Sequence, residues 1–83
     1  MGMIYDKIDR AIFKILYNNR PKPIGYQVLD RKMIVEMNED FTFTRTVSKR
    51  MQEYVELDFF TYEPLKGYTI TEKGIEEYLK MIL

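Results

Sequence analysis

The first third of the chain carries apolar residues at the spacing of a helix. They recur every three or four residues and therefore share one helical face. Asp6 precedes this stripe and can accept hydrogen bonds from the free amide groups of the first turn. Asn18 and Asn19, followed by two prolines, end the pattern, which predicts a helix over residues 6–19. Its stripe consists of Ile8, Ala11, Ile12, Ile15 and Leu16.

Two further helices are predicted in the middle of the chain. Residues 24–37 have an apolar helical face, although the run Met33-Ile34-Val35 could also be extended. After a brief extended segment at residues 41–43, Thr44 can cap a third helix that runs to Leu57. The apolar face of the second helix consists of Tyr26, Leu29, Met33 and Met37, and that of the third consists of Val47, Met51, Tyr54 and Leu57.

The last third of the chain predicts a hairpin and a final helix. Residues 59–62 and 68–70 are aromatic and β-branched, as strands are, and the five residues 63–67 between them form a loop with Pro64 and Gly67. Thr71 can cap the helix that follows. The resulting fold is α+β and mostly helical. The order matches a winged helix, in which a three-helix helix-turn-helix core carries a two-stranded hairpin wing and a C-terminal helix.

The composition narrows the possible functions. The 83 residues suit a single domain over residues 1–83, with 13 basic and 13 acidic residues and no Cys, His or Trp. Catalysis or zinc binding through Cys or His is therefore excluded. No run approaches the roughly 18 apolar residues of a membrane span, and no secretory signal is apparent, so we expect a cytoplasmic protein. We see no catalytic constellation, and expect no enzyme activity, cofactor or metal.

Three segments in the second half resemble winged-helix transcription regulators. Residues 44–54, TRTVSKRMQEY, are similar to a recognition helix, and residues 56–60, ELDFF, to the link into a wing. Residues 67–74, GYTITEKG, resemble the segment that closes the wing in MarR-like and PadR-like repressors. This resemblance implies a DNA-binding regulator at the superfamily level. Asp58 departs from it, standing where Gly is common, and the wing loop has a single base, Lys66.

The charges are unevenly distributed along the chain. Residues 14–32 have a balance of +4 and residues 44–52 a balance of +3, whereas residues 33–43 have −3 and residues 53–77 have −5. In a winged helix both basic blocks belong to the helix-turn-helix side. A local basic face can bind phosphates even when the net charge is zero. Ordinary solvated helix surface is the alternative explanation.

The third helix is the candidate element for reading DNA bases. Arg45, Lys49 and Gln52 share one face near its N-terminus, with Thr46 beside them. Arg can bind guanine and Gln can bind adenine through two hydrogen bonds in the major groove. The alternative is that these side chains serve only solubility. Predicted backbone contacts come from Thr44 and Ser48, from Lys66 in the wing, and from Arg20 and Lys22 after the first helix, where simple helix termination is the alternative. Arg50 lies nearer the apolar stripe and could either cover the core or reach the DNA backbone.

The final helix is a candidate dimer interface. Its apolar positions are more numerous than a thin core can cover, so we expect it to pair with its copy in a second subunit; packing on its own first helix is the alternative. These positions are Ile75, Tyr78, Leu79 and Ile82. The aromatic residues Tyr54, Phe59, Phe60, Tyr68 and Tyr78 fall at core positions, and Tyr62 is expected to be exposed.

The leading hypothesis is therefore a homodimeric regulator that binds double-stranded DNA sequence-specifically through residues 44–57. Two alternatives stay open. One is a winged helix that binds another protein, which the zero net charge and the single base in the wing favour. The other is an accessory subunit of nucleic-acid processing. The sequence does not indicate a small-molecule effector.

Overall fold

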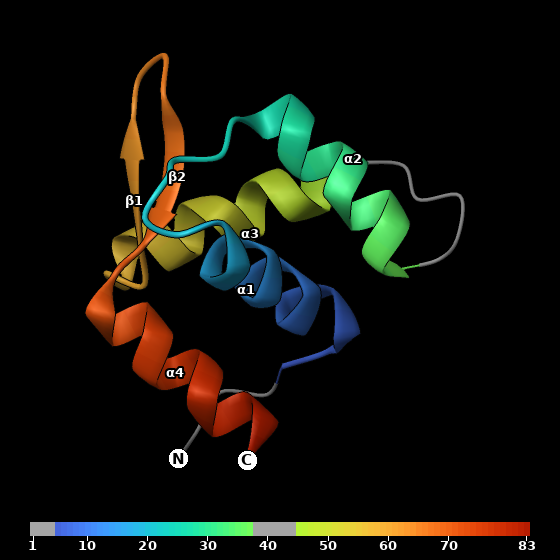
Figure 1. Ribbon diagram of the computed structural model, residues 1–83, viewed down its shortest axis with the longest axis vertical. Helices are drawn as coiled ribbons and strands as arrows, with labels where there is room; N and C mark the ends of the chain where they lie inside the picture. Colours follow the sequence, from blue (N-terminus) through green and yellow to red (C-terminus); the bar gives the residue numbers. More distant parts are fainter. Residues whose placement is uncertain (1–4, 38–44) are drawn as a thin grey trace.

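The computed structural model describes residues 5–37 and 45–83, with all side chains in these ranges except those of Arg45 and Thr46. In these residues the fold is α+β and mostly helical, as predicted, with four helices and one two-stranded antiparallel sheet (Figure 1). The order of elements is also the predicted one. The elements are α1 (Lys7–Asn19), α2 (Tyr26–Met37), α3 (Arg45–Glu56), β1 (Phe60–Glu63), β2 (Gly67–Ile70) and α4 (Glu72–Ile82).

Helix α1 is the central element of the fold. It packs against α2, α4 and β2, so its buried surface is wider than the predicted apolar stripe. Phe13 and Asp9 lie outside that stripe in the sequence pattern and are nevertheless buried. A capping box starts the helix: the Asp6 carboxylate accepts from the Asp9 N–H at 2.9 Å, and the Asp9 carboxylate accepts from the Asp6 N–H at 3.1 Å.

Aromatic rings fill the centre of the core around Phe13. Its ring centroid lies 4.8 Å from that of Phe60, 4.9 Å from that of Tyr54 and 5.8 Å from that of Phe59. Edge-to-face and tilted pairs at these distances add to the stabilisation from apolar burial. The core positions predicted for these aromatic residues are confirmed, except that Tyr68 is only partly buried. Tyr62 is exposed, as predicted.

The connection between α1 and α2 pairs with the sheet, which the sequence pattern did not predict. Ile24 was expected near the start of the second helix; instead it exchanges two backbone hydrogen bonds of 2.9 Å with Tyr68 of β2. Gly67 permits this close approach, because a Cβ atom there would lie 2.2 Å from the Ile24 carbonyl oxygen. Helix α2 begins two residues later, and Met33, Ile34 and Val35 are helical, as predicted.

A tight turn leads from α3 into the hairpin. The Asp58 N–H donates to the Val55 carbonyl at 3.1 Å, and the Phe59 N–H donates to the Tyr54 carbonyl at 2.9 Å, which is the Schellman pattern. Asp58 occupies the left-handed position of that motif, with φ at 65°. This is the position at which glycine was expected. Leu57, predicted to face inward, is 39% exposed because the helix ends here and the chain turns away.

The hairpin loop is shorter than predicted. Glu63 and Gly67 pair across the strands, so the loop contains three residues rather than five. The Lys66 N–H donates to the Glu63 carbonyl at 3.1 Å, and Leu65 has a φ of 71° inside this turn. Its side chain is fully exposed at the tip of the hairpin.

Helix α4 is fastened to the turn that precedes the hairpin. The Thr71 hydroxyl caps it by accepting from the Gly74 N–H at 3.0 Å, as predicted. A Cβ atom at Gly74 would lie 2.1 Å from the Phe59 carbonyl oxygen, so the glycine allows the helix to approach that turn. In the described part of the chain, no helix has the length and apolar character needed to cross a membrane.

Candidate nucleic-acid interface

The outer side of α3 brings together three of the predicted DNA-contacting residues. Ser48, Lys49 and Gln52 are exposed on it, and their side chains form no hydrogen bond or ion pair with a described residue. Two acids, Glu53 and Glu56, occupy the same side nearer the end of the helix. The outer side of α3 is therefore basic and polar toward its N-terminus and acidic toward its C-terminus. An approaching phosphate backbone would favour the N-terminal half.

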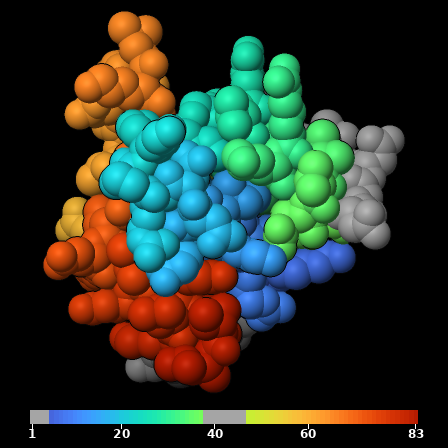
Figure 2. All heavy atoms as spheres, in the orientation of Figure 1, coloured from blue at the N-terminus to red at the C-terminus, as the bar shows by residue number. Residues whose placement is uncertain are grey.

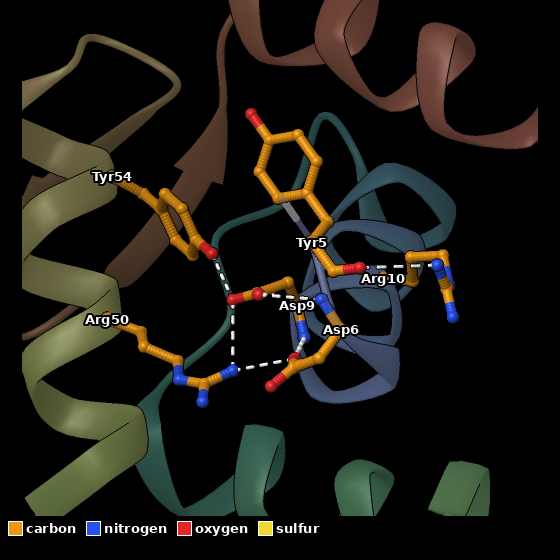
Figure 3. A network of polar contacts seen from close by, with 6 residues as sticks. All are labelled: Tyr5, Asp6, Asp9, Arg10, Arg50 and Tyr54. Atoms are coloured by element: carbon orange, nitrogen blue, oxygen red, sulfur yellow. Dashed lines mark hydrogen bonds and ion pairs between the residues drawn. The ribbon is translucent and has the colours of Figure 1, made fainter. Parts of the chain in front are cut away.

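Arg50 is turned to the inner side and does not belong to this surface. Its Nη1 donates to Asp6 Oδ1 at 2.7 Å and to Asp9 Oδ1 at 3.1 Å (Figure 3). Its side chain is 24% exposed. Arg50 was predicted to contact DNA, but its guanidinium is instead engaged in ion pairs with Asp6 and Asp9 at the start of α1.

The hydroxyl group of Tyr54 completes this network. It donates to Asp9 Oδ1, so two side chains of α3 converge on the start of α1 (Figure 3). Burial, together with the hydrogen bond to Asp9, holds the pKa of Tyr54 far above its ordinary value and keeps the hydroxyl protonated as a donor. The hydrogen bond from Arg50 holds the pKa of Asp6 well below its ordinary value, and Asp6 in turn raises the pKa of Arg50. The network fixes the orientation of α3 relative to α1.

The hairpin contributes one base with an acidic neighbour. Lys66 Nζ lies 3.3 Å from Glu63 Oε2 across the loop, and both side chains are largely exposed. Such a pair is weak, but it reduces the local positive charge that a phosphate would meet. The rings of Tyr62 and Tyr68 pack on one another beside it, with centroids 4.8 Å apart. The hairpin therefore presents more apolar and aromatic surface than basic surface.

The two bases after α1 lie on the connection to α2 rather than on α3. The Arg20 guanidinium stacks 3.7 Å from the centroid of the Tyr17 ring, and its Nη1 donates to the Tyr17 carbonyl at 2.6 Å. Lys22 is exposed. Arg20 therefore covers the end of α1, and Lys22 is the more available of the two for an ionic contact.

Three of the predicted contact residues are not fully described by the structure. Thr44 lies outside the described residues, as does the predicted extended segment at residues 41–43. Arg45 and Thr46 are described as backbone in the first turn of α3. Arg45 and Gln52 are seven positions apart and therefore fall on the same side of a helix. The contact of the Arg45 side chain with DNA stays a prediction.

The predicted dimer surface is divided between core and solvent. Tyr78 is buried, with its ring 5.0 Å from that of Tyr17 on α1, and Ile75 is half-buried against the core. Leu79 and Ile82 are exposed, at 39% and 55%. Helix α4 thus packs on α1 within one chain, the alternative considered above, and leaves the second half of its apolar set uncovered.

Asp9 is the principal residue of this region that sequence reasoning missed. It is a buried acid that receives hydrogen bonds from Arg50, Tyr54 and the Asp6 N–H. The spacing Asp6-x-x-Asp9 resembles a capping box, so the contact between Asp9 and Asp6 could have been predicted from the sequence. Its contacts with α3 span more than 40 positions of sequence, and no local pattern encodes them.

Comparisons of the chain with protein-family models, with curated proteins and with solved structures find no match. Among the described residues, no group of acidic side chains is arranged to hold a metal ion.

Proposed function

We propose that this chain is a winged-helix domain that binds double-stranded DNA in the cytoplasm and regulates transcription as a homodimer. Helix α3 would enter the major groove, where base edges present distinct hydrogen-bonding patterns. The observation that supports this proposal is the outer side of α3, where Ser48, Lys49 and Gln52 are exposed together on a helix that Arg50 and Tyr54 hold against α1. A helix held in this way, with polar side chains that bond to no described residue, is suited to reading bases.

The test is the salt dependence of binding to a random-sequence duplex, measured by fluorescence anisotropy. Replacing Lys49 with Ala should weaken binding and reduce the log–log salt slope by about 0.9, the effect of losing one phosphate neutralisation. Arg45→Ala should act similarly. Lys66→Ala should have a smaller effect because Glu63 already offsets its charge. Lys80→Ala, on the exposed side of α4, is the matched control and should leave binding unchanged.

Removing an acid from the same side of α3 tests the orientation independently. Glu53→Gln should tighten binding, since Glu53 is exposed one turn from Lys49 and repels phosphates. No binding by the wild-type protein at low salt would refute the DNA proposal. If Lys49→Ala and Lys80→Ala changed the affinity for the duplex equally, α3 would not be part of the DNA interface.

The homodimer has its own test. Leu79 and Ile82 would pair with their copies, and burying such apolar surface contributes roughly 25 cal/mol per Å2. Sedimentation equilibrium at micromolar concentration should show a dimer, and Leu79→Glu should give a folded monomer because Tyr78 still anchors α4 on α1. A monomeric wild-type protein would refute the dimer and leave the DNA proposal standing.

A protein-binding winged helix is the second candidate, and three ion pairs favour it. Arg50 is neutralised by Asp6 and Asp9, and Lys66 lies against Glu63. Lys49 is then the one base with a described side chain and no described acidic partner on α3 and the hairpin. The anisotropy measurement separates the two candidates directly, since a protein-binding domain would show no duplex affinity.

A further inference from the structure

The face of the molecule formed by α1, α2 and α4 is hollowed into two adjoining grooves. The larger, about 490 Å3, lies between α1 and α2, and the other, about 240 Å3, lies between α1, the end of α2 and α4. Glu36 lines both, so the two grooves adjoin along α1 at the Lys14–Glu36 ion pair, and together they are called the trough below. Figure 2 shows this face, with α1 in blue bordered by α2 in green and α4 in red. No described residue of α3 lines either groove.

Apolar side chains are exposed along the wall of this trough that α2 forms. Val28 and Val35 are 46% and 78% exposed, and both line the larger groove together with Ile15 of α1. The two valines are seven residues apart, which is two helical turns, so they project from the same side of α2. The buried residues of α2 are Leu29 and Met33, on its inner side. Helix α2 thus exposes two valines, Val28 partly and Val35 largely, on a side away from its buried residues.

Basic side chains surround this apolar strip. Five basic residues and one acidic residue line the two grooves. The acid, Glu36, already receives a hydrogen bond from Lys14 Nζ at 2.8 Å. Arg31 and Lys32 are exposed beside the two valines, and neither forms an ion pair with a described residue. The trough is therefore apolar along its wall and positively charged at its rim.

We propose that this trough is the docking site for an acidic amphipathic helix of a partner protein. The occupant is acidic because the uncompensated side chains at the rim are cationic, and complementary charge favours encounter and sets register. It is amphipathic because the valines need an apolar cover, which a sugar–phosphate backbone does not offer. A helix suits a groove between two helices, as in other helix-in-groove interactions.

The length of the trough sets the size of the occupant. It follows α1 from Lys7 to Asn19, and at 1.5 Å per residue this corresponds to a helix of about three to four turns. Apolar residues of the occupant spaced by seven would meet Val28 and Val35, and acids on both flanks would meet Arg31 and Lys32. The trough stands independently of DNA binding, since its uncompensated bases are Arg31 and Lys32, which the α3 interface leaves unused.

The experiment uses a synthetic acidic peptide as the probe. The peptide has four helical turns, with leucines on one face and glutamates on the others. Titrated into the isotopically labelled 83-residue protein, it should shift NMR amide signals of α1 and α2 that line the trough, with a micromolar Kd. Two control peptides should fail: one of the same composition with the leucines scattered around the helix, and one with lysine in place of every glutamate.

Two protein variants, each with a matched control, locate the site. Val35→Ser should weaken peptide binding about tenfold, since it removes an apolar contact without disturbing the core. Ile34→Ser is its control: Ile34 is 39% exposed on α2 but does not line the trough, and binding should be unchanged. Arg31→Gln should weaken binding about threefold at low salt and have no effect at high salt. Lys49→Gln should leave peptide binding intact.

The outcomes separate this proposal from the DNA proposal. Loss of duplex binding in Lys49→Gln with peptide binding retained supports both, and peptide binding without any duplex affinity supports the trough alone. Absence of signal shifts at about 1 mM peptide, or equal binding of the lysine peptide, would overturn the trough proposal. Signal shifts at residues of the larger groove, which contains no residue of α4, would also overturn the proposal if they were caused by duplex DNA or by raising the protein's own concentration. They would assign that groove to nucleic acid or to a second copy.

Discussion

Two adjacent cations of α3, Lys49 on its outer side and Arg50 on its inner side, differ in whether an acid pairs with them. On the inner side Arg50 is held by Asp6 and Asp9, whereas Lys49 on the outer side has no described acidic partner. The balance of +3 over residues 44–52 therefore overstates the positive charge that α3 offers to a ligand. The charge that a basic segment offers to a ligand therefore depends on which distant acids folding brings next to it.

The same comparison extends to the rest of the basic residues. Lys66 on the hairpin is partly offset by Glu63, and Lys14 by Glu36, whereas Arg31 and Lys32 have no acidic partner in the part of the chain that the structure describes. Among the described residues, bases without an acidic partner thus include Lys49 on the outer side of α3 and Arg31 and Lys32 at the trough between α1 and α2. These are the two surfaces to which we assign partners.

The largest expected effect comes from the apolar part of the inner side. Met51 has no exposed surface, and Met51→Ala should lower the free energy of unfolding by about 2–5 kcal/mol through lost burial and a cavity. Urea denaturation followed by circular dichroism measures this. Gln52→Ala, the adjacent outer residue, should change it by less than about 0.5 kcal/mol. Similar losses at both positions would abolish the distinction between the two sides.

Arg50 is expected to have the next largest effect. Arg50→Ala should lower the free energy of unfolding by about 2 kcal/mol, because the buried Asp9 carboxylate loses a charged donor. Arg50→Lys should recover part of this loss. Lys49→Ala should cost less than about 0.5 kcal/mol. If Arg50→Ala left the free energy of unfolding unchanged, the network would not anchor α3.

The C-terminal end of α3 offers a stabilising change. Asp58 has a φ of 65°, which glycine adopts without a steric penalty. Asp58→Gly should therefore raise the free energy of unfolding by about 0.5–1 kcal/mol. Asp58→Ala is the matched control and should not stabilise, since alanine keeps the Cβ atom that disfavours this conformation. Equal stabilisation by both would point to loss of the aspartate charge as the cause.

The smallest expected effect is the pH dependence contributed by Asp6. Arg50 lowers its pKa in the folded state, so its contribution to stability is present above the ordinary pKa near 3.9 and is lost as the pH falls through the folded value. Because the Asp6 side chain is 51% exposed, this contribution is only about 0.5 kcal/mol. Asp6→Asn keeps the helix cap but loses the charge.

Urea denaturation at a series of pH values measures the difference between the wild-type protein and Asp6→Asn. The wild-type protein should be more stable at pH 7, and the two stabilities should converge as the pH falls below about 4. A constant difference across the pH range would mean that the ion pair with Arg50 is not the source of the effect.

Local patterns in the sequence determined most of the secondary structure. The apolar stripes, the caps at Asp6 and Thr71 and the aromatic strands depend on residues a few positions apart, so the four helices and the hairpin could be predicted in order. The position of Asp58, where glycine is common and the backbone is left-handed, could be recognised for the same reason. The sequence also placed Ser48, Lys49 and Gln52 on a common helical face, because helical periodicity alone sets that arrangement.

Only the tertiary structure decided which of these groups remain available for a partner. The contacts of Asp9 with Arg50 and Tyr54, and the pairing of Ile24 with Tyr68, join segments more than 40 positions apart, so no local periodicity encodes them. The trough likewise arises only when α2 packs beside α1 with Val28 and Val35 turned outward. The physical reason is that burial and ion pairing depend on which surfaces meet, whereas helix and strand formation depends mainly on neighbouring residues.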